Sequence, residues 1–130
     1  MYEQITARIR IVVRPQFLEN QSEPDASKFV WAYTITMENF SGNTVQLLTR
    51  HWIITDALGR KQEVRGDGVI GEQPTLQPGD SFQYTSGCPL ATPSGMMTGS
   101  YGMIDSIGVA FDVAIPAFSL DSPYDVHSLN

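Results

Sequence analysis

Runs of alternating apolar and polar residues recur along this chain, and they constrain its fold more than any other feature. In residues 29–38 the large apolar side chains occupy every second position, as Phe29, Trp31, Tyr33, Ile35 and Met37. Residues 5–13 alternate in the same way with Ile, Ala and Val. Period-two spacing of β-branched and aromatic residues predicts strands that bury one face.

A strand over residues 45–55 is partly apolar on both faces. Unbroken alternation would place Leu48, Trp52 and Ile54 on one face with Gln46 and Arg50, and Leu47, His51 and Ile53 on the other. A strand with two apolar faces is typical of the centre of a sheet, between packed layers.

Further strands are expected at 60–65, 81–86, 96–103 and 108–120, which brings the number to about seven. The segments between them, such as 66–80 and 87–95, are rich in Gly and Pro and indicate loops. Seven short antiparallel strands in 130 residues predict an all-β fold, a sandwich of the immunoglobulin or fibronectin type III kind. We expect a single domain over residues 1–122, followed by a polar C-terminal tail at 123–130.

The charge distribution argues against nucleic-acid binding. The net charge is −6, and residues 66–130 hold seven acidic residues and no basic one. The eight basic residues are Arg8, Arg10, Arg14, Lys28, Arg50, Arg60, Lys61 and Arg65. Among these, only the three that alternate along 8–14 approach a cluster, and that spacing fits the outer face of a strand better than a phosphate-binding patch.

Two features indicate the cellular compartment of the protein: it has one cysteine, and it has no long apolar run. Cys88 has no second cysteine to pair with inside the chain, which favours a reducing environment. The N-terminal residues lack the pattern of a signal peptide, and no apolar run approaches the roughly 20 residues that span a bilayer. We therefore expect a soluble, cytoplasmic protein that does not contact a membrane.

The glycine-rich segment 66–71 is a literal GxGxxG motif, with glycines at Gly66, Gly68 and Gly71. In dinucleotide-binding proteins this motif precedes a helix whose N-terminus holds a pyrophosphate. Here Pro74 and Pro78 exclude such a helix. Two interpretations stay open: a phosphate loop that uses backbone amides, and a tight corner whose glycines adopt positive φ.

The residues do not form a recognisable catalytic or metal set. Asp67, Glu72 and Asp80 could hold Mg²⁺ through water, but a solvated acidic loop is the simpler interpretation. We expect Cys88 to be a partly buried loop thiol and His51 to make one hydrogen bond from a strand. No catalytic residue, metal ligand or cofactor is assigned. The aromatic residues are expected mainly in the core, with a minority lining a groove.

Six spaced blocks together resemble one family. They are LLTRHWIITD at 47–56, EVRGDGVIGEQP at 63–74, LQPG at 76–79, FQYTSG at 82–87, GMMTGSY at 95–101 and IPAFSL at 115–120. These blocks closely resemble the ApaG family, and the match runs from the first strand to Leu120. The resemblance implies an immunoglobulin or fibronectin type β-sandwich. It also implies an association with Co²⁺ and Mg²⁺ efflux phenotypes, a pyrophosphate motif at Gly66, Gly68 and Gly71, and, in eukaryotic relatives, a protein-interaction domain.

We predict a non-enzymatic binding domain that acts by protein–protein contact, with an indirect part in Co²⁺ and Mg²⁺ homeostasis and a partner that the sequence does not name. This function predicts an exposed apolar groove or an unpaired sheet edge. The first alternative is a site for a nucleotide, pyrophosphate or Mg²⁺ at the loop 66–71, with weak hydrolysis. The second is a structural homo-oligomer without a separate ligand.

Overall fold

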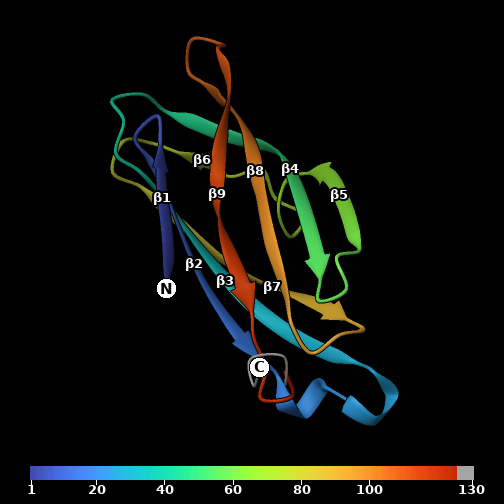
Figure 1. Cartoon of the computed structure of the whole chain (residues 1–130). Coiled ribbons are helices and arrows are strands. Elements are labelled where there is room, and N and C mark those ends of the chain that lie inside the picture. The colour runs from blue at the N-terminus through green and yellow to red at the C-terminus, as the bar shows by residue number, and fades with distance from the viewer. Residues whose placement is uncertain (126–130) are drawn as a thin grey trace.

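The structure, a computed structural model, describes residues 1–125, and these form two layers of antiparallel strands (Figure 1). The nine strands within this range are β1 (Tyr2–Thr6), β2 (Ile9–Phe17), β3 (Phe29–Asn39), β4 (Val45–Asp56), β5 (Lys61–Asp67), β6 (Thr75–Leu76), β7 (Ser81–Leu90), β8 (Gly95–Asp105) and β9 (Ala110–Leu120). Two 3₁₀ turns, η1 (Glu19–Gln21) and η2 (Pro24–Ala26), lie between β2 and β3. Neither of these helical turns is long or apolar enough to cross a membrane.

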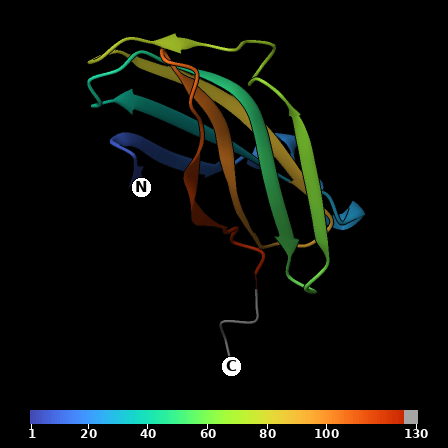
Figure 2. The same ribbon diagram turned by 90° about the horizontal axis from the view of Figure 1, so that it is seen from above.

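The two sheets lie face to face, as the view from above shows (Figure 2). One sheet has the order β1-β2-β3-β7, and the other has the order β5-β4-β8-β9 with β6 paired to β4. The all-β class and the sandwich predicted from the alternating pattern are therefore confirmed. The inner faces alternate as expected: every odd-numbered residue of β3 from Phe29 to Asn39 is buried.

The core lies between the sheets and is rich in aromatic side chains. The Trp52 indole makes edge contacts with Tyr33 of the opposite sheet at 5.3 Å and with Phe118 at 6.0 Å between ring centroids. The buried hydroxyls of Tyr84 and Tyr101 bond to each other across the sheets at 2.5 Å. Rings that interlock in this way fix the spacing of the two layers.

The structure has nine strands where the alternation predicted about seven, and two local features explain the difference. The run at 5–13 is interrupted by a two-residue hairpin turn at Ala7 (φ 49°) and Arg8 (φ 66°), which separates β1 from β2. The sequence lacks the Asn-Gly signal that usually marks such a turn. The other extra strand, β6, has only two residues and lies inside the segment expected to be a loop.

The strand β7 is also longer than predicted. It continues through Gly87, Cys88 and Pro89 to Leu90, a stretch expected to be a loop. Cys88 is therefore a strand residue in the core, with 3% of its surface exposed. The signal for a loop was the Gly and Pro content, but these two residues point outward on the last strand of a sheet, where proline is tolerated.

The segment after β9 packs against the sandwich as far as it is described. The Ser122 hydroxyl donates to the Pro93 carbonyl oxygen at 2.6 Å. The Tyr124 ring lies 6.0 Å from the rings of Phe17 and of Phe29. The remainder of the predicted tail, 126–130, lies outside the described residues, and the boundary at residue 122 stays a prediction.

The two sides of the sandwich differ. On one side β9 lies against β1 and β2, and the sheets are joined there by bonds from the Ala114 amide to the Thr6 hydroxyl and from the Ser119 amide to the Tyr2 hydroxyl, both 3.3 Å. On the other side the last strands are β5 and β7. Within residues 1–125, β5 pairs only with β4 and β7 only with β3. The sandwich is thus closed along β1 and β9 and open along β5 and β7.

The β1–β2 turn gives a test of the strand count. Ala7 and Arg8 both adopt the left-handed conformation, which costs L residues about 1–2 kcal/mol each. We expect the double variant Ala7→Asn/Arg8→Gly to raise the free energy of unfolding by about 1 kcal/mol, because Asn-Gly suits this turn. Urea denaturation of the double variant and of the unchanged protein measures this difference in free energy. The control is Arg14→Gly within β2, which should lower stability; a loss of stability in the double variant would contradict the turn.

Candidate functional site

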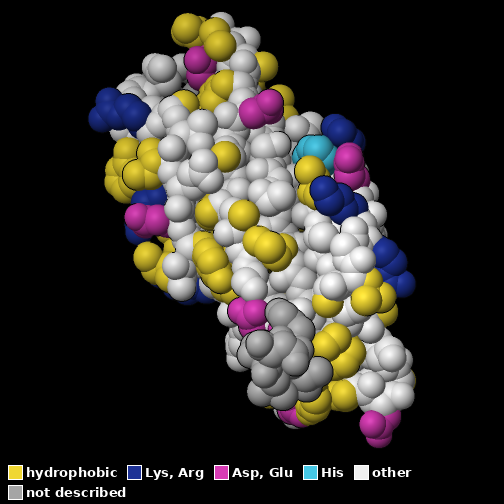
Figure 3. All heavy atoms as spheres, in the orientation of Figure 1, with side chains coloured by type: hydrophobic (Ala, Val, Ile, Leu, Met, Phe, Trp, Pro, Cys, Tyr) yellow, Lys and Arg dark blue, Asp and Glu magenta, His cyan; other side chains and the backbone are white. Residues whose placement is uncertain are grey.

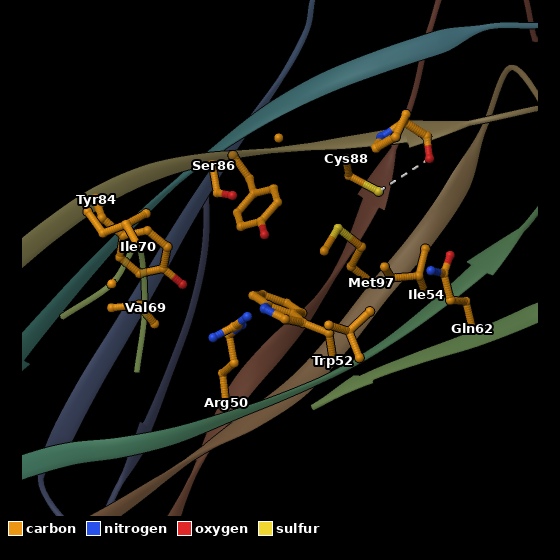
Figure 4. A pocket seen from close by; sticks show the side chains of 15 residues that line it. Arg50, Trp52, Ile54, Gln62, Val69, Ile70, Tyr84, Ser86, Cys88 and Met97 are labelled. Atoms are coloured by element: carbon orange, nitrogen blue, oxygen red, sulfur yellow. Dashed lines mark hydrogen bonds between the residues drawn. The ribbon is translucent and has the colours of Figure 1, made fainter. Parts of the chain in front are cut away.

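A cavity of about 440 Å³ opens on the side of the sandwich between β5 and β7 (Figure 4). Its walls come from both sheets and from the loop after β5. The lining residues are Tyr33, Arg50, Trp52, Ile54, Gln62, Val64, Val69, Ile70, Gly71, Tyr84, Ser86, Gly87, Cys88, Pro89 and Met97. Its volume lies within the range of about 300–1,000 Å³ that is usual for ligand pockets, and it is mostly apolar with a few polar groups.

A β-bulge in β4 places Leu47 on the same inner face as Arg50, which lines this cavity. The pairing of β4 with β8 shifts register between Leu47 and Thr49. One extra residue reverses the alternation, so Leu47 is buried on the same inner face as Arg50 and Trp52. The expected faces are therefore confirmed for Arg50, Trp52 and Ile54, and wrong for Leu47 and Leu48.

The Arg50 guanidinium is held by the glycine loop. Its Nη1 donates to the carbonyl oxygens of Asp67 at 2.8 Å and Gly68 at 2.9 Å. Gly66, its cross-strand neighbour on β5, leaves room for it, since a Cβ on Gly66 would lie 2.8 Å from Cζ. No carboxylate of residues 1–125 comes within 4 Å of this guanidinium. Arg50 is thus a cation at the cavity wall whose hydrogen-bond partners among residues 1–125 are backbone carbonyls.

Three tyrosines stand near Arg50 and keep their hydroxyls neutral. Burial raises the pKa of Tyr33 and that of Tyr84, and the charge of Arg50 opposes both shifts. Burial also raises the pKa of Tyr101, which bonds to Tyr84. At neutral pH the only charge that these groups bring to the cavity is the positive charge of Arg50.

The candidate phosphate loop is a tight turn. Val69 and Glu72 exchange two backbone hydrogen bonds of 2.8 Å, and the residues between them, Ile70 (φ 44°) and Gly71 (φ 79°), both have positive φ. Gly68 (φ 63°) has positive φ as well, and its amide donates to the Leu48 carbonyl oxygen. The amides of Gly68, Val69 and Glu72 are therefore used inside the protein.

The structure gives separate reasons for the three glycines of the motif. Gly68 and Gly71 adopt the positive φ that favours glycine, whereas Gly66 leaves the space that the Arg50 guanidinium fills. The chain continues into the strand β6 rather than into a helix. Phosphate binding at Gly66, Gly68 and Gly71 stays a prediction. The part of the loop that lines the cavity is Val69, Ile70 and Gly71, which we call the lip of the cavity.

Ile70 stands out at this lip. It is a β-branched residue with positive φ, a conformation that such residues rarely adopt. Its side chain is 56% exposed, while Val69 beside it is 1% exposed. An exposed, apolar and strained side chain at the rim of an apolar cavity is a reason to look for a ligand there.

The remaining candidate residues lie apart from this cavity or are inert within it. His51 points to the outer face of β4, where its Nε2 lies 3.1 Å from Glu63 Oε2. This is the single hydrogen bond from a strand that the sequence predicted for His51. Acidic and basic side chains surround the histidine on that surface (Figure 3), and the hydrogen bond from His51 and the charge of Arg65 lower the pKa of Glu63. Burial raises the pKa of the Cys88 thiol to about 11, so it is protonated at neutral pH. In the described part of the chain, Asp67, Glu72 and Asp80 do not come together, and no three metal-ligating side chains do.

Sequence reasoning did not select Arg50, although one signal was present. Arg50 was placed on the same strand face as Trp52 and Ile54, and a base on an apolar face requires an explanation. The partner carbonyls that supply this explanation are brought to Arg50 by tertiary structure. The cavity itself arises from the unequal closure of the two sides, which no local pattern encodes.

The glycines of the turn give a second test. A Cβ on Gly68 would lie 2.3 Å from the Glu72 carbonyl oxygen, whereas a Cβ on Gly71 would meet nothing within 4 Å. We expect Gly68→Ala to lower the free energy of unfolding by about 2–4 kcal/mol and Gly71→Ala by about 1 kcal/mol. Urea denaturation of both variants measures the difference. Equal losses would contradict the turn described here.

Comparison with known proteins places the chain in a family. The ApaG domain matches residues 19–105. The chain is 61% identical over 124 residues to the ApaG protein of Rhodospirillum centenum, covering 95% of each, and 58% identical over 130 residues to that of Paramagnetospirillum magneticum, covering all of both. It also matches a crystal structure of a Bordetella pertussis protein described as ApaA, with 45% identity, a TM-score of 0.87, and 90% and 95% of the two chains covered. The resemblance of the six sequence blocks is therefore confirmed, and this chain belongs to the ApaG family.

Proposed function

We propose that this domain is a non-enzymatic protein-interaction module that binds an extended segment of a partner protein along β7. The observation that carries the proposal is the position of this strand. The ten residues of β7 include no charged side chain, the strand is the last of its sheet, and its inner face lines the cavity. Within residues 1–125 the mostly apolar cavity and a strand edge without a partner thus lie side by side, which supports the proposal.

The two edge strands of the other sheet, β5 and β9, carry features that oppose pairing with another chain. Charged side chains follow one another along β5 at Lys61, Glu63 and Arg65. The strand β9 contains Asp112 and Pro116 and lies against β1. Charges and prolines are the usual means by which edge strands avoid pairing. The strand β7 has only Pro89 near its end, which leaves the stretch from Ser81 to Cys88 with peptide groups able to pair.

Addition of a strand to β7 would combine two sources of affinity. Main-chain hydrogen bonds would join the segment to the edge of the sheet, and alternate side chains of the segment would point toward the cavity. Ser86 and Cys88 lie on the inner face of β7 and line the cavity. Main-chain pairing would thus supply affinity for any extended segment, and the cavity would supply selectivity for particular side chains.

The residues considered for catalysis support a binding role. His51 is on the outer face of one sheet, paired with Glu63, and Cys88 is in the core of the other sheet with a raised pKa. A nucleophile needs a lowered pKa and a nearby base. We propose that the Co²⁺ and Mg²⁺ phenotypes implied by the family arise indirectly, through the bound partner in the cytoplasm.

The alternative of a nucleotide, pyrophosphate or Mg²⁺ site at 66–71 has less support from the geometry. Three amides of the loop already donate within the protein, and Arg50 is turned toward two carbonyl oxygens of the loop. Titration of the labelled protein with Mg²⁺ and pyrophosphate tests this alternative, through the amide signals of Gly66, Gly68 and Gly71.

Peptide selection tests the proposal directly. Random twelve-residue peptides displayed on phage would be selected on the purified full chain, and enriched peptides titrated into the ¹⁵N-labelled protein. We expect shift changes and slowed amide exchange along β7. Gln83→Lys, which puts a charge on β7, should weaken binding about tenfold, or about 1.4 kcal/mol.

The matched control is Gln4→Lys on β1, the opposite edge of the same sheet, which should bind like the unchanged protein. Chemical-shift changes confined to β1, β5 or β9 would contradict the proposal. Equal peptide affinity of the two lysine variants would contradict it as well. A dimer in light scattering with protected β7 amides would identify a second copy of the chain as the occupant and would also contradict it.

A further inference from the structure

We infer that the cavity between β5 and β7 selects a carboxylate attached to an apolar or aromatic body, with Arg50 as its counter-ion. The inference rests on the proposed function, since the partner segment would deliver this group as an acidic side chain or as a chain end. It adds the chemical class of the group that the cavity recognises.

The donors of Arg50 are only partly used. A guanidinium has five N–H groups in a planar fork that matches a carboxylate. The two hydrogen bonds of Arg50 both start from Nη1, and no other acceptor within residues 1–125 bonds to Nη2 or Nε. The side chain is also the cationic member of the cavity lining, which contains no acidic residue. A carboxylate bound here would take up free donors and neutralise a partly buried charge.

The remaining lining residues determine which group the ligand carries besides its carboxylate. Val64 lies opposite Trp52 on the neighbouring strand. Beyond Trp52 the wall is formed by Ile54, Met97 and the polar Gln62, which Figure 4 shows away from the Arg50 end of the cavity. Arg50 and Ile54 are four residues apart on one strand, which corresponds to about 13 Å. A ligand that reaches both therefore has a charged end and an apolar body.

Ile70 supports the same assignment from the loop. Its strained φ of 44° presents an exposed apolar side chain at the lip of the cavity. An Asn or Gly would suit the turn better, so folding alone does not favour isoleucine at this position. Figure 4 shows Ile70 beside Tyr84, away from Ile54 and Met97, so its contact would be with the part of the apolar body next to the carboxylate.

Two matched probes test the inference. N-acetylphenylalanine carries the carboxylate and the aromatic ring, and N-acetylphenylalanine amide lacks only the charge. Each would be titrated into the full chain labelled with ¹⁵N and with ¹³C at the Met methyls. We expect the acid to shift the Trp52 indole and Met97 methyl signals and to bind at least tenfold more tightly than the amide.

Two charge-removing variants distinguish a specific role of Arg50 from a general effect of the protein's positive charge. Arg50→Gln should abolish the preference for the acid over the amide, whereas Arg65→Gln, which removes a charge from the outer side of β5, should retain it. Ile70→Asn should raise the urea midpoint of the protein and weaken both probes about threefold, because the turn is relieved while an apolar contact is lost. This variant keeps the test valid if Arg50→Gln unfolds.

The outcomes distinguish this inference from the proposed function. Equal binding of acid and amide, or shifts confined to the outer face around His51, would overturn the carboxylate site while leaving strand addition to β7 intact. Acid-selective, Arg50-dependent binding together with peptides that never add to β7 would support the site, assign it to a free small carboxylate, and overturn the proposed function.

Discussion

The contact of the Arg50 guanidinium with the carbonyl oxygens of Asp67 and Gly68 is the interaction on which the open side of this sandwich depends. It joins the centre of one sheet to the loop that follows its edge strand. The side chain shares the inner face of β4 with Trp52, and Gly66 leaves the space that it fills. The loop is thereby held as a lip over the cavity, with Val69 buried and Ile70 exposed.

The unequal closure of the two sides explains why a binding face arises here. Along β1 and β9 the layers are in contact and joined by hydrogen bonds across the sheets. Along β5 and β7 the apolar inner faces end in a cavity, and Trp52, Tyr33 and Tyr84 form part of its wall. A partner strand on β7 would complete this side, which relates the interaction proposed for the domain to an incomplete part of its core.

Much of the fold could be predicted from the sequence because strand alternation is a local property. The burial of every second residue of β3 follows the alternation of large apolar residues in the sequence. Prediction was wrong where the backbone departs from regularity without a local signal: the hairpin at Ala7 and Arg8, the continuation of β7 through Pro89, and the bulge that moves Leu47 to the inner face. The glycine motif was visible, but the role of Gly66 depends on Arg50, which lies sixteen positions earlier and becomes its neighbour only through strand pairing.

The mobility of the Arg50 guanidinium tests the central claim most directly. In ¹⁵N-arginine-labelled protein, free guanidinium groups rotate rapidly and average their Nη signals, whereas a group held by hydrogen bonds at Nη1 rotates slowly. The account predicts two resolved Nη resonances for Arg50, and one averaged signal for Arg8 in the exposed β1–β2 turn. A single averaged Nη signal for Arg50, like that of Arg8, would contradict a guanidinium fixed between the glycine loop and the cavity.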